Sequence, residues 1–155
     1  MFLFHRYARC AICNERIREL RSLLPELCAK TGLTVMFFCH SDRERLLAEF
    51  GELPLPFEII PDPKRIMYAQ FGVARSLVRT LRPKSVATIA RARRQKPDDG
   101  KPAGLERPLT VIPADFFADA TGTLAAVHYG EFLGDTWSTE TIQRLAESGP
   151  IAQQG

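Results

Sequence analysis

Near the N-terminus the chain reads FLFHRYARCAIC, residues 2–13, and this stretch decides the fold. Residues 2–4 are an apolar run that predicts a short buried strand. A helix is expected from Cys13 to about residue 30, because its apolar side chains recur every three or four positions and share one face. These side chains are Cys13, Ile17, Leu20, Leu24 and Leu27. A strand that leads directly into a helix predicts the first unit of an α/β fold.

The rest of the chain alternates between apolar runs and amphipathic stretches. Strands are expected at 33–39, 57–60, 114–118 and 123–129, and helices after Ser41, after Asp62 and from Trp137. The order is β-α-β-α-β-α, then an insertion, then β-β-α. Such alternation predicts a mostly parallel sheet with helices on both faces, and the terminal hairpin adds antiparallel strands. We therefore expect an α/β protein, a three-layer α/β/α sandwich around a central mixed sheet.

The ends of these helices carry recognisable signals. Pro25 should kink or restart the first helix, and Gly32 should end it. Ser41, followed three residues later by Glu44, predicts a capping box, with Leu46, Leu47 and Phe50 as the core face of that helix. Asp62 and Pro63 are typical of an N-cap and a first helical residue.

Positive charge is concentrated in one segment. The whole chain carries +3, whereas residues 75–107 carry ten basic and three acidic side chains, a balance of +7. We interpret 75–108 as a basic helical insertion within a domain of residues 1–148: two short helices interrupted by Pro83, then a loop from 96. It should lie at the periphery of the sheet, with 96–106 as the most mobile part between the termini and 149–155 as a flexible tail.

The basic segment has several interpretations. It could be a solvated surface or a patch for an anionic partner. Nucleic acid is a less favoured partner because no aromatic residue is interleaved with the basic ones. No apolar run approaches the ~20 residues of a membrane span, and the apolar start is too short for a signal peptide. We therefore expect a cytoplasmic protein with no membrane association.

Cys10 and Cys13 form the most informative motif. Four cysteines are too few for a disulfide scaffold, so a closely spaced pair points to redox or metal chemistry. A helix N-terminus favours a thiolate, and Arg6 and Arg9 add positive charge. We expect Cys10 to be exposed at the helix tip as the attacking thiol and Cys13, one turn deeper, to resolve the intermediate.

Two other interpretations of the cysteines stay open: inert packing, and half of a zinc site completed by Cys28, Cys39 or His40. We favour core packing for Cys28, and for Cys39 either packing or a secondary thiol role at a strand end. Asp115 could face the cysteines as a proton acceptor, or face solvent on an edge strand, which we prefer. No phosphate-cradling glycine loop is visible, so no cofactor and no metal are expected.

These residues resemble the peroxiredoxin-like proteins of the alkyl hydroperoxide reductase/thiol-specific antioxidant (AhpC/TSA) superfamily, which have a thioredoxin fold. The similarity covers most of residues 2–147. It rests on residues 4–13, on 56–63, on 68–73, on 112–122 and on 129–138.

The resemblance implies a thiol-dependent reductase of peroxides or disulfides, with Cys10 at the position of the attacking thiol. A thiol donor such as a thioredoxin or glutathione system would supply the electrons. Tyr7 stands where true peroxiredoxins carry Thr or Ser, and Pro113 stands where they carry Arg, as thioredoxin has a proline there. We therefore expect Pro113 to lie beside Cys10 and to shape the site, with a cis Ile112–Pro113 bond.

Two further expectations follow. Family members usually carry an extra N-terminal segment, whereas this chain begins at the first core strand, so uncovered apolar surface should be hidden in a homodimer. The alternative function is a non-catalytic thioredoxin-fold binding module that uses the basic insertion at 75–107 as its interaction surface.

Overall fold

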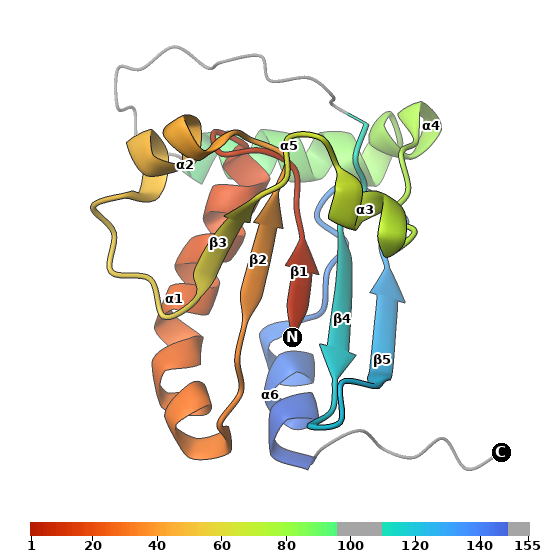
Figure 1. The fold of residues 1–155 in the computed structure, drawn as a ribbon. Helices are drawn as coiled ribbons and strands as arrows, with labels where there is room; N and C mark the ends of the chain where they lie inside the picture. The colour runs from red at the N-terminus through yellow and green to blue at the C-terminus, as the bar shows by residue number, and fades with distance from the viewer. Residues whose placement is uncertain (96–109, 149–155) are drawn as a thin grey trace, which may run out of the picture.

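The computed structural model describes residues 1–95 and 110–148, and a mixed sheet of five strands forms its centre (Figure 1). The strands are β1 (Phe2–Phe4), β2 (Met36–Cys39), β3 (Glu58–Pro61), β4 (Ala114–Ala118) and β5 (Leu124–Tyr129). Their spatial order is β3-β2-β1-β4-β5. β1, β2 and β3 are parallel, while β4 runs antiparallel to β1 and β5 antiparallel to β4. The predicted mixed sheet with its terminal hairpin is confirmed.

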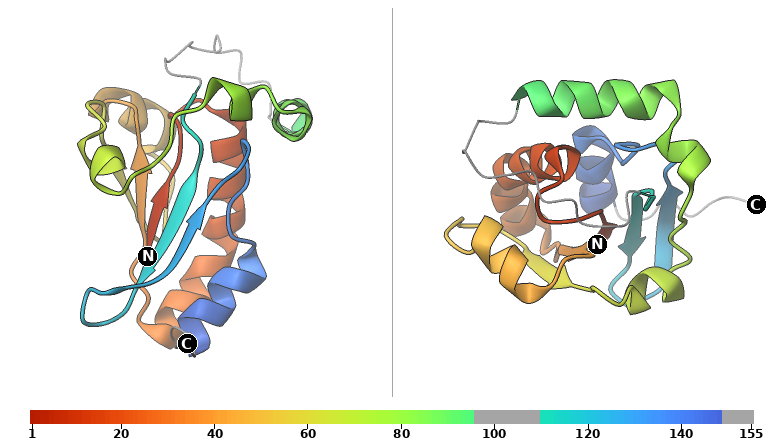
Figure 2. Two further views of the ribbon diagram at one scale, coloured as in Figure 1. Left: turned by 90° about the vertical axis from the view of Figure 1, so that its right-hand side faces the viewer. Right: turned by 90° about the horizontal axis from the view of Figure 1, so that it is seen from above.

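Helices lie on both faces of this sheet (Figures 1 and 2). The helices are α1 (Ala11–Thr31), α2 (Arg43–Phe50), α3 (Ile66–Gln70), α4 (Leu77–Thr80), α5 (Pro83–Gln95) and α6 (Thr139–Ser148). α1 and α6 cover one face, and α3 lies on the other. α5 lies outside these layers and packs against α1. The predicted α/β class and layered, thioredoxin-like arrangement are thus correct.

The alternation of side chains along the strands divides the core into two parts. Leu3 and Phe37 point toward α1 and α6, whereas Phe4 and Phe38 point toward α3. All four are buried, because β1 and β2 are central strands with a neighbour on each side. The chain therefore leaves β1 with its next residue, His5, on the α1 face.

The first helix is longer than its periodicity predicts. It begins at Ala11, with Cys10 as its N-cap, and Pro25 lies inside it without ending it. Gly32 ends the helix as expected, with a left-handed φ of 72° and an N–H that donates to the carbonyl of Cys28. The loss of one backbone donor at Pro25 is tolerated because the buried face continues on both sides of it.

Two of the predicted helix starts are wrong in detail. Asp42, not Ser41, caps α2 by accepting the N–H of Arg45 at 2.9 Å, and Leu47 of the expected core face is 50% exposed. The N-cap residue of α3 is Arg65 and not Asp62, and the helix begins at Ile66 and not at Pro63, but the side chain of Asp62 still reaches its first turn. The carboxylate accepts the N–H groups of Ile66 at 2.9 Å and Met67 at 2.8 Å.

The predicted insertion contains a longer helix than expected. Pro83 does not interrupt it but is the first residue of α5, where its missing N–H is not needed. The described helices of this segment, α4 and α5, lie off the sheet, yet they are tied to the loop after β5. Arg79 donates to the carbonyl of Gly130 at 3.1 Å, and the N–H of Leu133 donates to the buried hydroxyl of Ser85 at 2.9 Å. The expected mobility of 96–106 and the tail at 149–155 lie outside the described residues.

Candidate active site

The loop between β1 and α1 is fixed to the end of β2. His5 N–H donates to the carbonyl of Phe38 at 3.0 Å, and His40 N–H donates to the carbonyl of Arg6 at 2.9 Å. The hydroxyl of Ser41, which the sequence assigned to a helix cap, instead accepts the N–H of Ala8 at 2.8 Å. These bonds place Cys10 at the first turn of α1, and its carbonyl accepts the N–H of Asn14.

Arg6 contacts both thiols of the predicted pair. Its guanidinium Nη1 lies 3.7 Å from Sγ of Cys10, and its backbone N–H lies 3.4 Å from Sγ of Cys13. Arg6 is itself buried, with its guanidinium 5.0 Å from the centroid of the Tyr7 ring. A buried cation is weakly screened by solvent, so its effect on the nearest thiol is large.

The two thiols differ strongly in acidity. Burial alone would raise the pKa of Cys10, but a hydrogen bond from Cys13, the Arg6 guanidinium and the N–H groups of Cys13 and Ile12 outweigh it and lower the pKa to about 6. For Cys13, burial and the neighbouring Cys10 raise the pKa well above its ordinary value. At neutral pH this arrangement favours a thiolate at Cys10 and a neutral thiol at Cys13.

The expected exposure of Cys10 is wrong, because both cysteines are buried. Cys10 is 2% exposed and belongs to a small apolar cluster with Cys13, Ile112, Leu133 and Ala92. Ala92 is on α5, and Ile89 of the same helix packs against this cluster. The predicted insertion therefore covers the cysteine pair, which a reading of α1 alone could not show. Both cysteines are free, with no disulfide between them.

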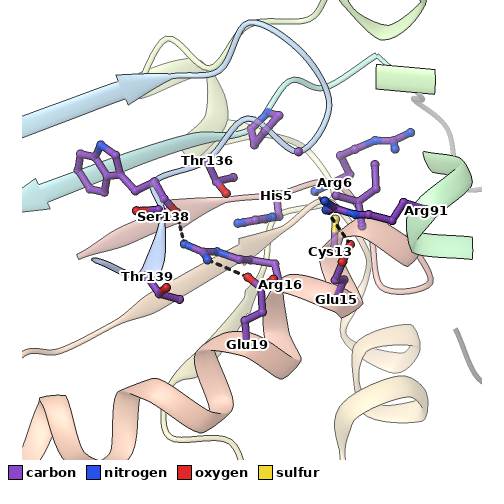
Figure 3. A pocket seen from close by; sticks show the side chains of 14 residues that line it. His5, Arg6, Cys13, Glu15, Arg16, Glu19, Arg91, Thr136, Ser138 and Thr139 are labelled. Carbon is purple, nitrogen blue, oxygen red and sulfur yellow. Dashed lines mark hydrogen bonds and ion pairs between the residues drawn. The ribbon is translucent and has the colours of Figure 1, made fainter. Parts of the chain in front are cut away.

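A pocket of about 410 Å³ opens beside Cys13, between the N-terminal half of α1, α5 and the loop before α6 (Figure 3). Cys13, Arg6 and Arg91 lie at one end, and Arg16 lies with Ser138 and Thr139 at the other. His5, Glu15, Glu19, Pro113, Thr136 and Trp137 also line it. The lining mixes cationic, anionic and hydroxyl groups, so the pocket can bind a polar molecule next to a thiol.

Of the remaining predicted site residues, Pro113 lies beside the cysteines and Arg9 does not. Pro113 lines the same pocket as Cys13, and Ile112 packs in the cluster of Cys10, so this segment lies beside the cysteines. The cis geometry expected for the bond between them stays a prediction. Arg9 points toward α2, where its Nε lies 3.9 Å from Glu49. Of the two predicted arginines, Arg6 is the one that contacts the thiols.

Asp115 takes neither of its expected positions. It is fully buried in β4, a strand with neighbours on both sides, and its Oδ2 accepts the N–H of Trp137 at 2.7 Å. Burial raises its pKa to about 6. His5, which lies on the same face of the sheet, stacks on Phe37, and burial together with the charge of Arg16 lowers its pKa to about 3. Arg16, also buried, donates to the carbonyl of Trp137.

The other two cysteines take no part in this pocket. Cys39 is buried in the main core, as the packing interpretation requires, whereas Cys28 is only half-buried. In residues 1–95 and 110–148, no three His, Cys, Asp or Glu side chains are arranged to hold a metal ion. No helix among the same residues has the length and apolar character needed to span a membrane.

Residues 19–131 match the family model described as AhpC/TSA antioxidant enzyme. The chain belongs to the AhpC/TSA family. The match includes β2 to β5 and Pro113, but it begins after Cys10 and Cys13. No curated protein and no solved structure matches the chain.

AhpC/TSA proteins are in general thiol-dependent peroxidases and oxidoreductases, which use peroxide substrates and thiol reductants. The resemblance stated from the sequence motifs is thereby confirmed at the level of the family. The cysteine pair predicted from the sequence, Cys10 and Cys13, lies outside the matched residues. The roles of Cys10 and Cys13 therefore rest on their geometry alone.

The pocket-lining residues that sequence reasoning missed include His5, Arg16 and Arg91. The sequence positions of Arg16 and His5 could have indicated their role. Arg16 follows Cys13 by three positions, so it adjoins the apolar stripe of α1, where a charged residue is unusual. His5 follows a buried strand on the same side as Leu3. Arg91 carried no such signal, because its place beside Glu15 depends on how α5 packs.

Proposed function

We propose that the protein is a thiol-dependent oxidoreductase that reduces peroxides or disulfides through Cys10 and Cys13. The observation that carries this proposal is the contact of one buried arginine, Arg6, with both sulfur atoms. It accompanies a Cys10 pKa of about 6 and a Cys13 pKa well above its ordinary value. A low pKa at Cys10 supplies the attacking thiolate, and a high pKa at Cys13 keeps the resolving thiol protonated.

With a hydroperoxide, the Cys10 thiolate attacks the terminal oxygen and the O–O bond breaks. The alcohol or water leaves with a proton, and Cys10 becomes a sulfenic acid. The Cys13 sulfur then attacks the Cys10 sulfur, water leaves, and a disulfide forms. A dithiol donor, such as a reduced thioredoxin, or two molecules of a thiol such as glutathione, returns two electrons and two protons to restore both thiols.

With a disulfide, the Cys10 thiolate attacks one sulfur and releases the other as a thiolate. The resulting mixed disulfide is resolved when Cys13 attacks Cys10, which frees the second thiol. Pro113 supports this reaction by its place beside the cysteines. The backbone there is already paired within the chain, because Ile112 N–H donates to the carbonyl of Ala74 at 3.1 Å and the carbonyl of Pro113 accepts the N–H of Gly130 at 3.0 Å. Pro113 therefore contributes the wall of the pocket beside Cys13.

Access to Cys10 limits both reactions. With α5 in place, Ala92 is fully buried and Cys10 is 2% exposed. A protein disulfide requires α5 to move aside, whereas a small hydroperoxide requires a much smaller opening. The substrate size that the protein accepts therefore reports on the position of α5.

Turnover with hydrogen peroxide, an organic hydroperoxide and a protein disulfide, each with excess dithiothreitol, tests the proposal. Cys10→Ser should abolish turnover. Cys13→Ser should retain the first attack and accumulate sulfenic acid or a mixed disulfide. Cys28→Ser is the matched control, because Cys28 lies near the far end of α1. Equal loss of first-step reactivity in the Cys10 and Cys13 variants would refute the assigned roles.

A second candidate function is a non-catalytic binding module. Leu77, Val78 and Leu81, at and just after α4, are 66%, 76% and 72% exposed and lie among basic side chains. This composition suits an acidic protein surface with apolar contacts. Thiol titration with an alkylating reagent at neutral pH separates the two: one thiol that reacts much faster than the others supports the enzyme, and four slow thiols support the module.

A further inference from the structure

A second pocket lies on the opposite face of the sheet from the cysteines, beside α3. Its volume is about 300 Å³, and three cationic side chains line it: Lys64, Arg65 and Arg75. The rest of its wall is largely apolar, with Ala69, Val73 and Val111. No carboxylate is among the residues described as lining it. Three cations around an apolar floor favour an anionic ligand with an organic part.

Arg65 is held in an unusual backbone conformation. Its φ of 57° and ψ of 38° are left-handed, and within the described residues it is the only non-glycine with a positive φ. Glycine adopts this conformation without steric strain, whereas a side chain does so at an energetic penalty. Strained residues concentrate at functional sites, where the side chain has a task that offsets the strain.

One nitrogen of the Arg65 guanidinium has no hydrogen-bond partner among the described residues. Its Nη1 is buried without a hydrogen-bond partner, and Arg65 forms no ion pair within residues 1–95 and 110–148. The nearby Asp62 is already engaged, because its carboxylate accepts N–H groups at the start of α3. A buried donor without a partner calls for an acceptor that the chain does not supply.

We propose that this pocket binds a small phosphate monoester. A phosphate group presents several charged oxygens, so it can meet two guanidinium groups and one ammonium group together, whereas a carboxylate presents only two oxygens. The apolar wall then contacts the organic part of the ester. The site is separate from the cysteine pocket and does not depend on the proposed redox function.

Isothermal titration with phenyl phosphate, inorganic phosphate and benzoate tests this site at physiological salt. Phenyl phosphate should bind saturably and more tightly than either of the other two. Arg65→Gln should weaken it by about tenfold or more, as loss of a charge-assisted hydrogen bond implies. Arg18→Gln, which removes the same charge from an exposed position on α1, should leave the affinity unchanged.

Arg65→Gly separates binding from folding. It removes both the guanidinium and the backbone strain, so Tm should be unchanged or higher while phenyl phosphate binding is lost. Turnover at Cys10 should stay the same in this variant. The proposal is overturned if phenyl phosphate does not saturate, if benzoate binds equally well, or if Arg18→Gln weakens binding as much as Arg65→Gln.

Discussion

The two faces of the sheet are packed with different chemistry. On the α3 face the buried groups are mostly aromatic: the rings of Phe4 and Phe38 stack at 4.7 Å, and Phe116 meets Phe4 edge-on at 5.5 Å. The hydroxyl of Tyr68 is also buried there and lies 2.6 Å from the carbonyl of His5. On the α1 face, titratable groups are buried next to the thiol pocket.

This difference indicates a division of tasks. The aromatic face contributes free energy of folding, because rings in contact gain from both burial and edge-on packing. On the α1 face His5, Arg16 and Asp115 each keep one buried polar atom without a hydrogen-bond partner among the described residues, and on the α3 face Arg65 keeps one. Such groups destabilise a fold, so their concentration near Cys13 marks where the protein gives up stability for chemistry. Substitutions on the two faces should therefore have separable effects.

The largest expected effect is on the aromatic face. Phe116→Ala removes a ring that lies 5.0 Å from Phe71 and 5.4 Å from Tyr129. We expect the free energy of unfolding to fall by about 3–5 kcal/mol, as for other buried Phe→Ala changes. Urea denaturation measures this loss, and Phe116→Leu is the milder variant if the first fails to fold. A change in the thiolate titration of Cys10 in the folded variant would contradict the division of tasks.

The next effect is a pair of opposed pH dependences on the polar face. Between pH 3.8 and about 6, Asp115 keeps its proton in the folded chain but loses it in the unfolded one. Its contribution to stability is therefore lost as pH rises through this window. Between about pH 3 and 6.5, His5 is neutral in the folded chain and protonated in the unfolded one. Its contribution to stability is therefore lost as pH falls. The effects of the two groups on the slope of stability against pH have opposite signs.

Single substitutions should expose each slope. In His5→Phe, which retains a ring to stack on Phe37, stability should fall as pH rises from 4 to 6. In Asp115→Asn, which can still accept the N–H of Trp137, stability should fall as pH drops over the same range. Each change should amount to about 2–3 kcal/mol over the window. Urea melts at several pH values measure it, and equal slopes in both variants would show that these groups are not the source.

A smaller effect concerns the acidity of Cys10. Arg6→Gln removes the guanidinium 3.7 Å from Sγ, so the pKa of Cys10 should rise from about 6 by about one pH unit, equivalent to about 1.4 kcal/mol. Thiolate absorbance at 240 nm against pH measures the midpoint. Arg9→Gln is the matched control, because Arg9 lies against Glu49 instead. The same rise in both variants would mean that general positive charge, and not the contact of Arg6, sets the acidity.

The smallest effect is at the outer side of α5. Arg91 pairs with Glu15 at 3.4 Å, but its side chain is 63% exposed, so water and salt screen the pair. Arg91→Gln should change the free energy of unfolding by less than about 0.5 kcal/mol. Urea denaturation checks this. A larger loss would show that the ion pair, and not the apolar contacts of Ile89 and Ala92, holds α5 in place.

The sequence predicted those features that local chemistry determines. The apolar runs gave the strands, and the spacing of Ile17, Leu20 and Leu24 gave the buried face of α1. Arg6 could be named because it precedes Cys10 in the same loop. Local sequence does not decide a helix start where two capping residues are adjacent, as with Ser41 and Asp42, because the contact of Ser41 with Ala8 is made across the fold.

What could not be predicted depends on tertiary contacts. Pro83 is compatible with either the interruption of a helix or its first residue, and only the packing of α5 on α1 decides between them. The burial of Cys10 has the same origin, because Ile89 and Ala92 are distant in sequence. The phosphate-monoester pocket likewise combines residues 64–65 with Arg75, and no short motif joins them.

The burial of Cys10 beneath α5 has a kinetic consequence. If α5 opens and closes faster than a reagent reacts, the observed rate constant is the product of the open fraction and the intrinsic rate constant of the exposed thiolate, as in hydrogen exchange. The Cys10 thiolate then reacts more slowly in the folded protein than the same thiolate would if it were exposed. Low concentrations of urea, far below those that unfold the chain, would accelerate it in proportion to the surface uncovered when α5 detaches.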